Sequence, residues 1–326
     1  MEEFESASPN LTVYLGNGLT LEAAVDLVVD ADAAAGRIGF TLGRMQVVQL
    51  PPPSHGQPPF YCFFPPGRED RPVNAAEGGE SPDPLSPESV ERSGQSYFVV
   101  SLTGWRLLLL ANPFAYSARC ATWATHAMVE QAAVGREAGL WQGLLEAMLR
   151  LCQALNGDIV GFNALAGNSM KRLHAVSHRP PPGLGPYPLQ RAAAELGAAA
   201  LRGRAHLGPE TGYPLDAFRF GYRDPGESAV LAAELVEKWQ RIGGPFATAS
   251  VAAVLEDGGP ALYVVPRNRL LFPFGWPGMA AVMEVMGVGV SSRPDLIGRV
   301  RGGEWGHADF GRLLASLRPA GVRSLC

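Results

Sequence analysis

An α+β fold built on antiparallel sheet is the class that this sequence predicts. Strand-like segments occur in neighbouring pairs, 97–103 with 105–111 and 247–255 with 261–265. Amphipathic segments of helical periodicity lie between these pairs. A parallel, doubly wound sheet would instead alternate single strands with single helices. The pairing therefore favours hairpins that join into an antiparallel sheet with flanking helices.

The first predicted element is a helix over residues 20–35. The hydroxyl of Thr20 is suited to cap its first turn. Two strand-like pieces follow at 38–43 and 45–50. The apolar stripe of the helix, at helical spacing, consists of Leu21, Ala24, Val25 and Val28.

The composition changes at residues 65–96. This stretch is rich in Pro, Gly, Glu and Ser and has almost no large apolar side chains. Such a segment buries too little apolar surface to offset the entropy lost on ordering. We therefore predict a mobile loop here, followed by a strand hairpin with its turn at Thr103-Gly104.

Residues 137–155 show the clearest helical periodicity in the chain. Asn156-Gly157 is a typical helix end, and a strand over 158–163 is expected to follow it. The apolar stripe of this helix consists of Leu140, Leu144, Met148 and Leu151.

A proline-rich break at 179–186 divides the chain. We place an N-terminal half at 1–180 and a C-terminal α+β half at 181–326, because mixed helix and strand patterns resume after the break. The expected elements of the second half are helices at 190–201 and 228–241, the strand pair named above, and a helix near 277–286.

Charge and hydropathy exclude several classes of function. The chain has 326 residues and a formal net charge of -4, without the basic stripe of a non-specific nucleic-acid binder. Its longest apolar runs fall short of the roughly 20 residues that a membrane span needs. The acidic start Met-Glu-Glu-Phe-Glu does not resemble a signal peptide. We expect a cytoplasmic protein that binds neither nucleic acid nor membrane.

Residues 161–178 carry the densest set of chemically useful side chains. A strand, a glycine-containing loop and a second strand are expected here, and the backbone amides of such a loop can hold a phosphate. An imidazole beside that phosphate can act as a nucleophile. The alternative is an irregular surface hairpin. The candidate site residues are Asn163, Gly167, Asn168, Ser169, Lys171, Arg172, His174 and His178.

The residue types suggest separate roles. Gly167 allows the positive φ of a tight loop, and Ser169 offers a hydroxyl to a phosphoryl oxygen. By strand alternation Arg172 and His174 share a face, with Lys171 reaching in from the loop. His174 would attack an α-phosphorus while Arg172 neutralises the developing charge.

The sequence Ala166-Gly-Asn-Ser-Met-Lys-Arg-Leu-His174-Ala-Val resembles a known active-site strand. It is similar to the Gly-x-Ser-x-x-His-x-His-x-Gln strand of the transferase branch of the histidine-triad superfamily. That branch includes galactose-1-phosphate uridylyltransferases, diadenosine tetraphosphate phosphorylases and GDP-hexose phosphorylases. The resemblance implies that Ser169 binds phosphate and that His174 becomes nucleotidylated. It also implies a histidine-triad-like antiparallel sheet in two related halves.

Two further segments resemble the same branch. Asn112-Pro113-Phe-Ala-Tyr, followed by His126 and Gln131, is similar to its Asn-Pro-Phe-Pro-Tyr segment and trailing His and Gln. Val264-Val-Pro-Arg267 is similar to a Pro-Arg segment of the C-terminal halves. In order, the three segments span roughly residues 97–310. The resemblance adds Asn112 to the nucleotide-binding candidates.

Two positions depart from the family pattern. Arg172 stands where the first histidine is expected, and Val176 stands where the family has a glutamine that holds a phosphate oxygen. A guanidinium is a strong phosphate partner, whereas valine cannot make that hydrogen bond. Either His174 reacts within a rebuilt phosphate cradle, or the protein binds nucleotide without turnover.

The main hypothesis is therefore a nucleotidyltransferase or nucleotide phosphorylase. It would transfer a nucleoside monophosphate from a nucleoside diphosphate sugar or a dinucleoside polyphosphate through a nucleotidyl-histidine. A hydrolase with water as acceptor, a non-catalytic nucleotide binder, and an unrelated α+β protein are the alternatives.

Cofactors and partners are only partly defined by the sequence. The four scattered cysteines form no Cys-x-x-Cys pair, so we expect no structural metal site. No cofactor is expected, although a magnesium ion that arrives with substrate phosphates is compatible with the sequence. The base, the sugar, the acceptor and the oligomeric state, a homodimer included, stay open.

Overall fold

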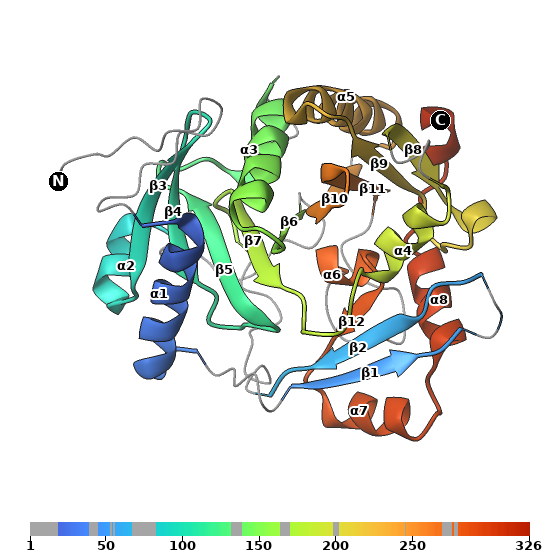
Figure 1. Ribbon diagram of the computed structural model, residues 1–326, viewed down its shortest axis with the longest axis horizontal. Helices are drawn as coiled ribbons and strands as arrows, with labels where there is room; N and C mark the ends of the chain where they lie inside the picture. The colour runs from blue at the N-terminus through green and yellow to red at the C-terminus, as the bar shows by residue number, and fades with distance from the viewer. Residues whose placement is uncertain are drawn as a thin grey trace.

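The central feature of the protein is a large antiparallel sheet. The computed structural model describes residues 19–38, 45–52, 54, 56–66, 83–131, 139–163, 170–197, 202–244, 246–268, 276 and 280–326. Within them the sheet has nine strands in the spatial order β3-β4-β5-β7-β6-β10-β11-β9-β8 (Figure 1). The strands are β3 (Tyr97–Leu102), β4 (Trp105–Ala111), β5 (Ala118–Thr125), β6 (Ile159–Asn163), β7 (His174–Arg179), β8 (Gly203–Leu207), β9 (Ala217–Gly221), β10 (Thr248–Glu256) and β11 (Gly259–Arg267). The predicted α+β class with antiparallel sheet is confirmed.

One arrangement of strands occurs twice in this sheet. β4, β5, helix α3 (Leu140–Ala154), β6 and β7 follow one another in the chain, and their strands lie in the order 4-5-7-6. β8, β9, helix α5 (Pro225–Ile242), β10 and β11 repeat that scheme, with the order 8-9-11-10. The two sets meet where β6 pairs antiparallel with β10. The predicted division near residue 180 falls between β7 and the next helix, while the sheet continues across it.

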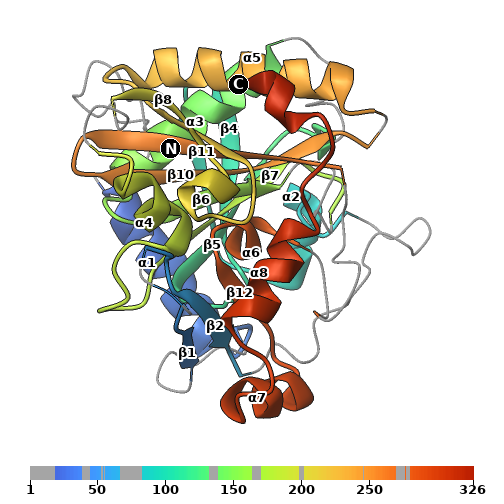
Figure 2. The same ribbon diagram turned by 90° about the vertical axis from the view of Figure 1, so that its right-hand side faces the viewer.

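Helices α1, α3 and α5 cover one side of the sheet, which we call the helix face. α1 (Leu21–Ala34) begins at Thr20, whose Oγ1 accepts a hydrogen bond from Ala23 N at 3.2 Å, as the sequence predicts. α3 and α5 pack against each other along β10 and β11 (Figures 1 and 2). The three helices and the inward side chains of the sheet share one hydrophobic core.

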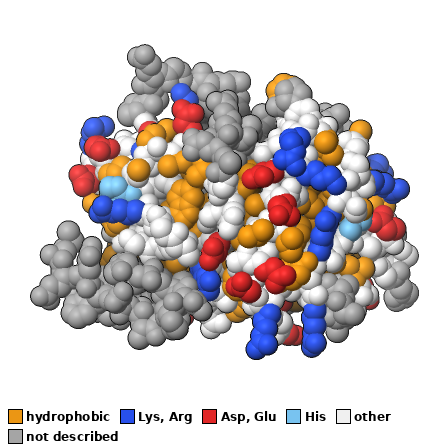
Figure 3. Space-filling view, turned by 90° about the horizontal axis from the view of Figure 1, so that it is seen from above, with side chains coloured by type: hydrophobic (Ala, Val, Ile, Leu, Met, Phe, Trp, Pro, Cys, Tyr) orange, Lys and Arg blue, Asp and Glu red, His pale blue; other side chains and the backbone are white. Residues whose placement is uncertain are grey.

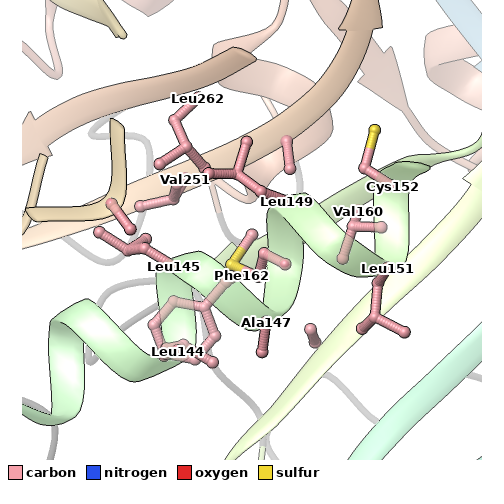
Figure 4. Close-up of a cluster of buried hydrophobic side chains, with 14 of the residues drawn as sticks. Leu144, Leu145, Ala147, Leu149, Leu151, Cys152, Val160, Phe162, Val251 and Leu262 are labelled. Carbon is pink, nitrogen blue, oxygen red and sulfur yellow. The ribbon is translucent and has the colours of Figure 1, made fainter. Parts of the chain in front are cut away.

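Helix α3 confirms the most periodic part of the sequence. Leu144, Met148 and Leu151 of the predicted stripe are buried, together with residues such as Leu145 and Cys152 on the same side. Figure 4 shows Leu144, Leu145, Leu151 and Cys152 of this helix together with Val160 and Phe162 of β6 and Val251 of β10. The helix ends at Ala154, and both Asn156 and Gly157 have positive φ, as expected for a helix end.

A second layer covers the other side of the sheet, which we call the far face. Its main part is a small sheet in the order β1-β2-β12, in which β12 runs parallel to β2. A second hydrophobic core joins this layer to the large sheet. Figure 2 shows the elements of the layer, among them α6, α8 and β12, below β10 and β11. The layer contains β1 (Gln46–Leu50), β2 (Phe60–Phe64), β12 (Val288–Val290), α4 (Pro188–Ala194), α6 (Val282–Val285), α7 (Pro294–Arg301) and α8 (His307–Ala315), with short 3-10 helices at Pro209–Thr211 and Val322–Leu325.

The prediction of a structureless loop over 65–96 is wrong for its C-terminal part. Residues 87–93 form helix α2 (Pro87–Ser93), which begins after the capping residue Ser86 and buries Val90. Val90 packs with Leu108 and Leu110 on the far face of β4. A single apolar side chain and a good cap order this short helix, because the sheet supplies the surface that it covers. Residues 67–82 lie outside the described residues.

Several predicted boundaries differ from the structure. The helix expected at 190–201 is the shorter α4, which begins at Pro188 and ends before Gly197, a residue with positive φ. The helix expected near 277–286 is a single turn, α6, and the strand expected at 38–43 lies almost wholly outside the described residues. The strands that the sequence did not predict are β2, β5, β8, β9 and β12.

Gly161 of β6 allows the closest approach between the sheet and the far-face layer. A Cβ built at Gly161 would lie 2.5 Å from Val282 Cγ1, 3.2 Å from Cγ2 and 3.3 Å from Cβ. Rotation of the valine therefore gives no relief, since all three carbons crowd the same point. The glycine lets α6 rest directly on the centre of the sheet.

We expect the substitution Gly161→Ala to destabilise the fold by about 1–3 kcal/mol, because an added methyl overfills a packed contact. Equilibrium urea unfolding measures this free energy. The double variant Gly161→Ala/Val282→Ala should recover part of the loss. An unchanged midpoint in the single variant would contradict the contact.

His178 lies in the far-face core. Its Nδ1 is 3.3 Å from the Tyr116 hydroxyl and its Nε2 is 3.1 Å from the Tyr187 hydroxyl. Burial lowers the pKa of the imidazole from 6.5 to about 3. The folded protein therefore holds this histidine in its neutral form at every pH near neutrality.

This burial predicts a loss of stability in mild acid. Because the pKa is depressed in the folded state, protons bind preferentially to the unfolded chain below pH 6.5. Stability is full above that pH and falls as the pH drops towards 3. Between about pH 7 and about pH 5 the loss amounts to about 2 kcal/mol. Urea unfolding of the wild type and of His178→Gln at both pH values measures the contribution of His178 to this loss. An equal change in unfolding free energy with pH in the two proteins would contradict the prediction.

Candidate functional site

A row of polar side chains crosses the middle of the sheet on its far face. It consists of His174 on β7, Asn163 on β6 and Ser250 on β10, and we call it the polar row. Ser250 pairs with Asn163, and extension of the β6–β7 register places Asn163 beside His174. Ser250 Oγ donates to Asn163 Oδ1 at 2.7 Å. The strand alternation that puts Ala175 in the helix-face core turns His174 to the far face.

The ring of His174 is oriented by the backbone. Its Nδ1 lies 2.9 Å from the carbonyl oxygen of Arg172. A carbonyl only accepts hydrogen bonds, so Nδ1 carries the proton and, in the neutral ring, Nε2 carries the lone pair. The side chain is only partly buried. This is the tautomer that a histidine nucleophile needs if it reacts through Nε2.

Gln131 clamps the two strands where the β6–β7 hairpin opens. Its buried side chain accepts a hydrogen bond from His174 N at 3.1 Å and donates to the carbonyl oxygen of Asn163. The backbone N–H of Gln131 donates to the carbonyl oxygen of Lys171 at 2.7 Å. One side chain thus satisfies a backbone group on each strand at the first position beyond the regular ladder.

Arg172 is not placed as the sequence predicts. It lies before β7, in an isolated bridge with Glu130, and its guanidinium is buried. Nε donates to Asp83 Oδ2 at 2.5 Å, while Nη1 donates to the carbonyl oxygens of Thr125 and His126 at 2.7 and 3.0 Å. The expected alternation fails here because the regular strand begins only at His174. The guanidinium is held by the protein itself.

The remaining candidates are distributed over different places. Lys171 is exposed beside Arg172. Asn112 closes its own turn, since its Oδ1 accepts from Phe114 N at 2.9 Å. His178, a candidate for phosphate binding, is fully buried in the far-face core between two tyrosines, away from the polar row. Gly167, Asn168 and Ser169 lie outside the described residues.

Three residues of this neighbourhood carry no clear signal in the sequence. Ser250 and Asp83 lie 87 and 89 positions from their partners Asn163 and Arg172, so only the folded sheet brings them together. Gln131 appears in the sequence only as a trailing residue of the Asn-Pro segment. A cross-strand register for β6 and β10 would have found Ser250, but nothing short of the tertiary structure finds Asp83.

The described residues also bear on three other possibilities: a metal site, a membrane-spanning helix and a strongly charged surface. Among the described side chains, no group of three or more His, Cys, Asp or Glu is arranged to hold a metal ion. No helix in the described part of the chain has the length and apolar character to cross a membrane. On the side seen in Figure 3, the acidic and basic side chains that are described are interspersed.

Among known proteins, similarity to this chain is found in three-dimensional structure and not in sequence. No protein-family model matches the chain, and no curated protein matches it. Among solved structures, yeast Ap4A phosphorylase Apa2 is similar, with a TM-score of 0.61 and 12% identity over 92% of this chain and 96% of that chain.

The complexes of the same yeast enzyme agree with this result. The AMP complex has a TM-score of 0.62 and 15% identity, over 93% of this chain and 99% of that chain. The Ap4A complex has a TM-score of 0.59 and 15% identity, over 91% and 95%. At such identities the likeness establishes architecture. The chain has the fold of yeast Ap4A phosphorylase Apa2 across nearly its whole length.

Proposed function

We propose that this protein is a nucleotidyltransferase or nucleotide phosphorylase with His174 as its nucleophile. The observation that carries the proposal is the hydrogen bond from His174 Nδ1 to Arg172 O, which leaves the lone pair on Nε2. The polar row lies beside the same residue, and the Gln131 clamp holds the backbone of His174 on its strand. Support also comes from the shared fold, because the yeast enzyme is an Ap4A phosphorylase with AMP and Ap4A complexes.

The reaction would proceed by two displacements at phosphorus. In the first, the His174 Nε2 lone pair forms a bond to the α-phosphorus, and the bond from that phosphorus to the bridging oxygen breaks. The remaining phosphate chain leaves with the bonding electron pair. In the second, an oxygen of inorganic phosphate attacks the same phosphorus and returns the electron pair to the imidazole. Dinucleoside polyphosphates are the first substrate class to test, with nucleoside diphosphate sugars next.

Asn163 and Lys171 are the described side chains best placed to assist. Asn163 lies beside His174 in the polar row, and its carboxamide can bind ribose or phosphate when Ser250 releases it. Lys171 is exposed three residues before His174 and carries a mobile positive charge. These groups would stabilise the phosphoryl oxygens as negative charge develops there.

A second candidate is nucleotide binding without turnover. Two observations favour it: Val176 packs against the far-face core, and the guanidinium of Arg172 is engaged by Asp83 and two carbonyls. In this case no side chain among the described residues replaces the family glutamine, and nothing there assists the phosphate chain in leaving the phosphorus. A hydrolase that uses water as the acceptor is a variant of the first candidate.

We expect the wild type to form a covalent adduct of one nucleoside monophosphate per chain when it is incubated with Ap4A or a nucleoside diphosphate sugar. The substitution His174→Ala should abolish the adduct, because it removes the only nitrogen that attacks. Intact-mass spectrometry measures the adduct. His206→Ala on the distant strand β8 is the matched control and should retain it.

Each outcome of that experiment separates the candidates. An adduct that disappears when phosphate is added, with nucleoside diphosphate as product, identifies a phosphorylase. Turnover to nucleoside monophosphate without phosphate identifies the hydrolase. Saturable nucleotide binding with neither adduct nor turnover identifies the binding protein and overturns the main proposal.

The Gln131 clamp predicts a loss of both stability and adduct formation. Gln131→Leu keeps the approximate volume but leaves Asn163 O and His174 N without the hydrogen bonds of the side chain. A buried group left unsatisfied costs about 1–3 kcal/mol. Urea unfolding gives the stability, and the rate of adduct formation should fall by about tenfold. The exposed residue Gln153 supplies the control, Gln153→Leu; equal behaviour of the two variants would show that the clamp does not matter.

A further inference from the structure

An ion pair links the turn before helix α2 to the residue that orients His174. Asp83 Oδ2 and Arg172 Nε are 2.5 Å apart, with side-chain exposures of 22% and 5%. The two residues are 89 positions apart in the sequence. The proposed chemistry assigns no step to this pair, whose polar atoms bind each other and the backbone of Leu85, Thr125 and His126.

The guanidinium is fixed from two sides. Asp83 holds Nε, and the carbonyl oxygens of Thr125 and His126 hold Nη1 from the end of β5. The backbone around it is also secured, because Thr125 N donates to Leu173 O and Leu173 N donates to Val129 O. The Arg172 carbonyl, which accepts from His174 Nδ1 at 2.9 Å, therefore belongs to a peptide with little freedom to turn.

Asp83 uses both of its oxygens. Oδ2 binds Arg172, and Oδ1 accepts a hydrogen bond from Leu85 N at 3.0 Å in the turn that leads into α2. The carboxylate is thereby held at a fixed point over the end of β5. A buried guanidinium without such a counter-charge is costly, and it would shift to find another partner. Any shift would disturb the contacts of Nη1 with the carbonyl oxygens of Thr125 and His126, which help to hold Arg172 in place.

We propose that Asp83 is a positioning residue for His174 and acts through Arg172. Its carboxylate balances and anchors the buried guanidinium, which keeps the Arg172 carbonyl aimed at Nδ1 and keeps the imidazole in the Nδ1–H tautomer. Arg172 then serves to orient the nucleophile, in place of the phosphate contact that its sequence position suggests. The kinetic consequence rests on the proposed function, whereas the effect on the tautomer does not.

The substitution Asp83→Asn removes the charge but keeps an oxygen that can accept from Leu85 N. Long-range ¹H–¹⁵N spectra of the ligand-free protein report the protonation of Nδ1 and Nε2 of His174 directly, with the signal assigned by its loss in His174→Ala. In the wild type we expect a proton on Nδ1 and none on Nε2. In Asp83→Asn we expect a mixture of the two tautomers, while Asp83→Glu, which retains the carboxylate, should restore the wild-type pattern.

Kinetics provide the second readout. Asp83→Asn should lower the rate of adduct formation, or kcat, by about tenfold with KM changed by less than about twofold, because the nucleophile and not the binding surface is disturbed. The matched control is Asp295→Asn, which breaks an exposed Arg293–Asp295 pair of the same 2.5 Å separation on α7. It should leave both the spectrum and the rates at wild-type values.

The outcomes are separable. A wild-type tautomer in folded Asp83→Asn overturns the positioning role, whatever the kinetics show. If the wild type forms no adduct and Asp83→Asn still changes the tautomer, the positioning role is supported and only the proposed function is contradicted. If Asp83→Asn does not fold, Asp83→Ser keeps a hydroxyl for Leu85 N and undergoes the same comparison; a wild-type tautomer there overturns the proposal equally.

Discussion

The antiparallel pairing of β6 with β10 is the interaction on which the rest of the structure depends. It joins two sets of strands, each with its own helix, into a single sheet. It also sets Ser250 opposite Asn163, and so creates the polar row beside His174. Without that register, the two sets would have separate edges and the far-face layer would have no continuous surface to cover. The site is therefore a property of the junction more than of either set.

Packing at this junction is tight on both sides. α3 and α5 press on the helix face, and α6 rests on Gly161 from the far face. Such confinement favours a site whose groups are held in advance of ligand binding, as the proposed displacement at phosphorus would require. The hydrogen bonds around His174 extend the same principle to the backbone. Gln131 binds His174 directly, whereas the end of β5 and the turn before α2 bind the neighbouring Arg172.

Much of the fold could be predicted from local patterns. The helices α1, α3 and α5 and the strands β3, β4, β10 and β11 follow from apolar periodicity and capping or turn residues, which act within a few positions. β5, β8 and β9 were not predicted because their apolar runs are short. Polar residues interrupt these runs and find their partners only across the sheet, as Arg219 does with Glu256. α2 was not predicted because its stability comes from the packing of Val90 against β4, a strand that the sequence alone does not place beside it.

For the candidate site, the sequence by itself determined that His174 stands on a strand, and the structure places it at the start of β7. The sequence also determined that Gln131 precedes that strand. The tertiary structure alone decided that Arg172 faces Asp83, that His178 is buried between tyrosines and that Ser250 joins the row. The physical reason is range: strand alternation and turn chemistry act over a few residues, whereas charge pairing and burial depend on which distant segments the fold brings together.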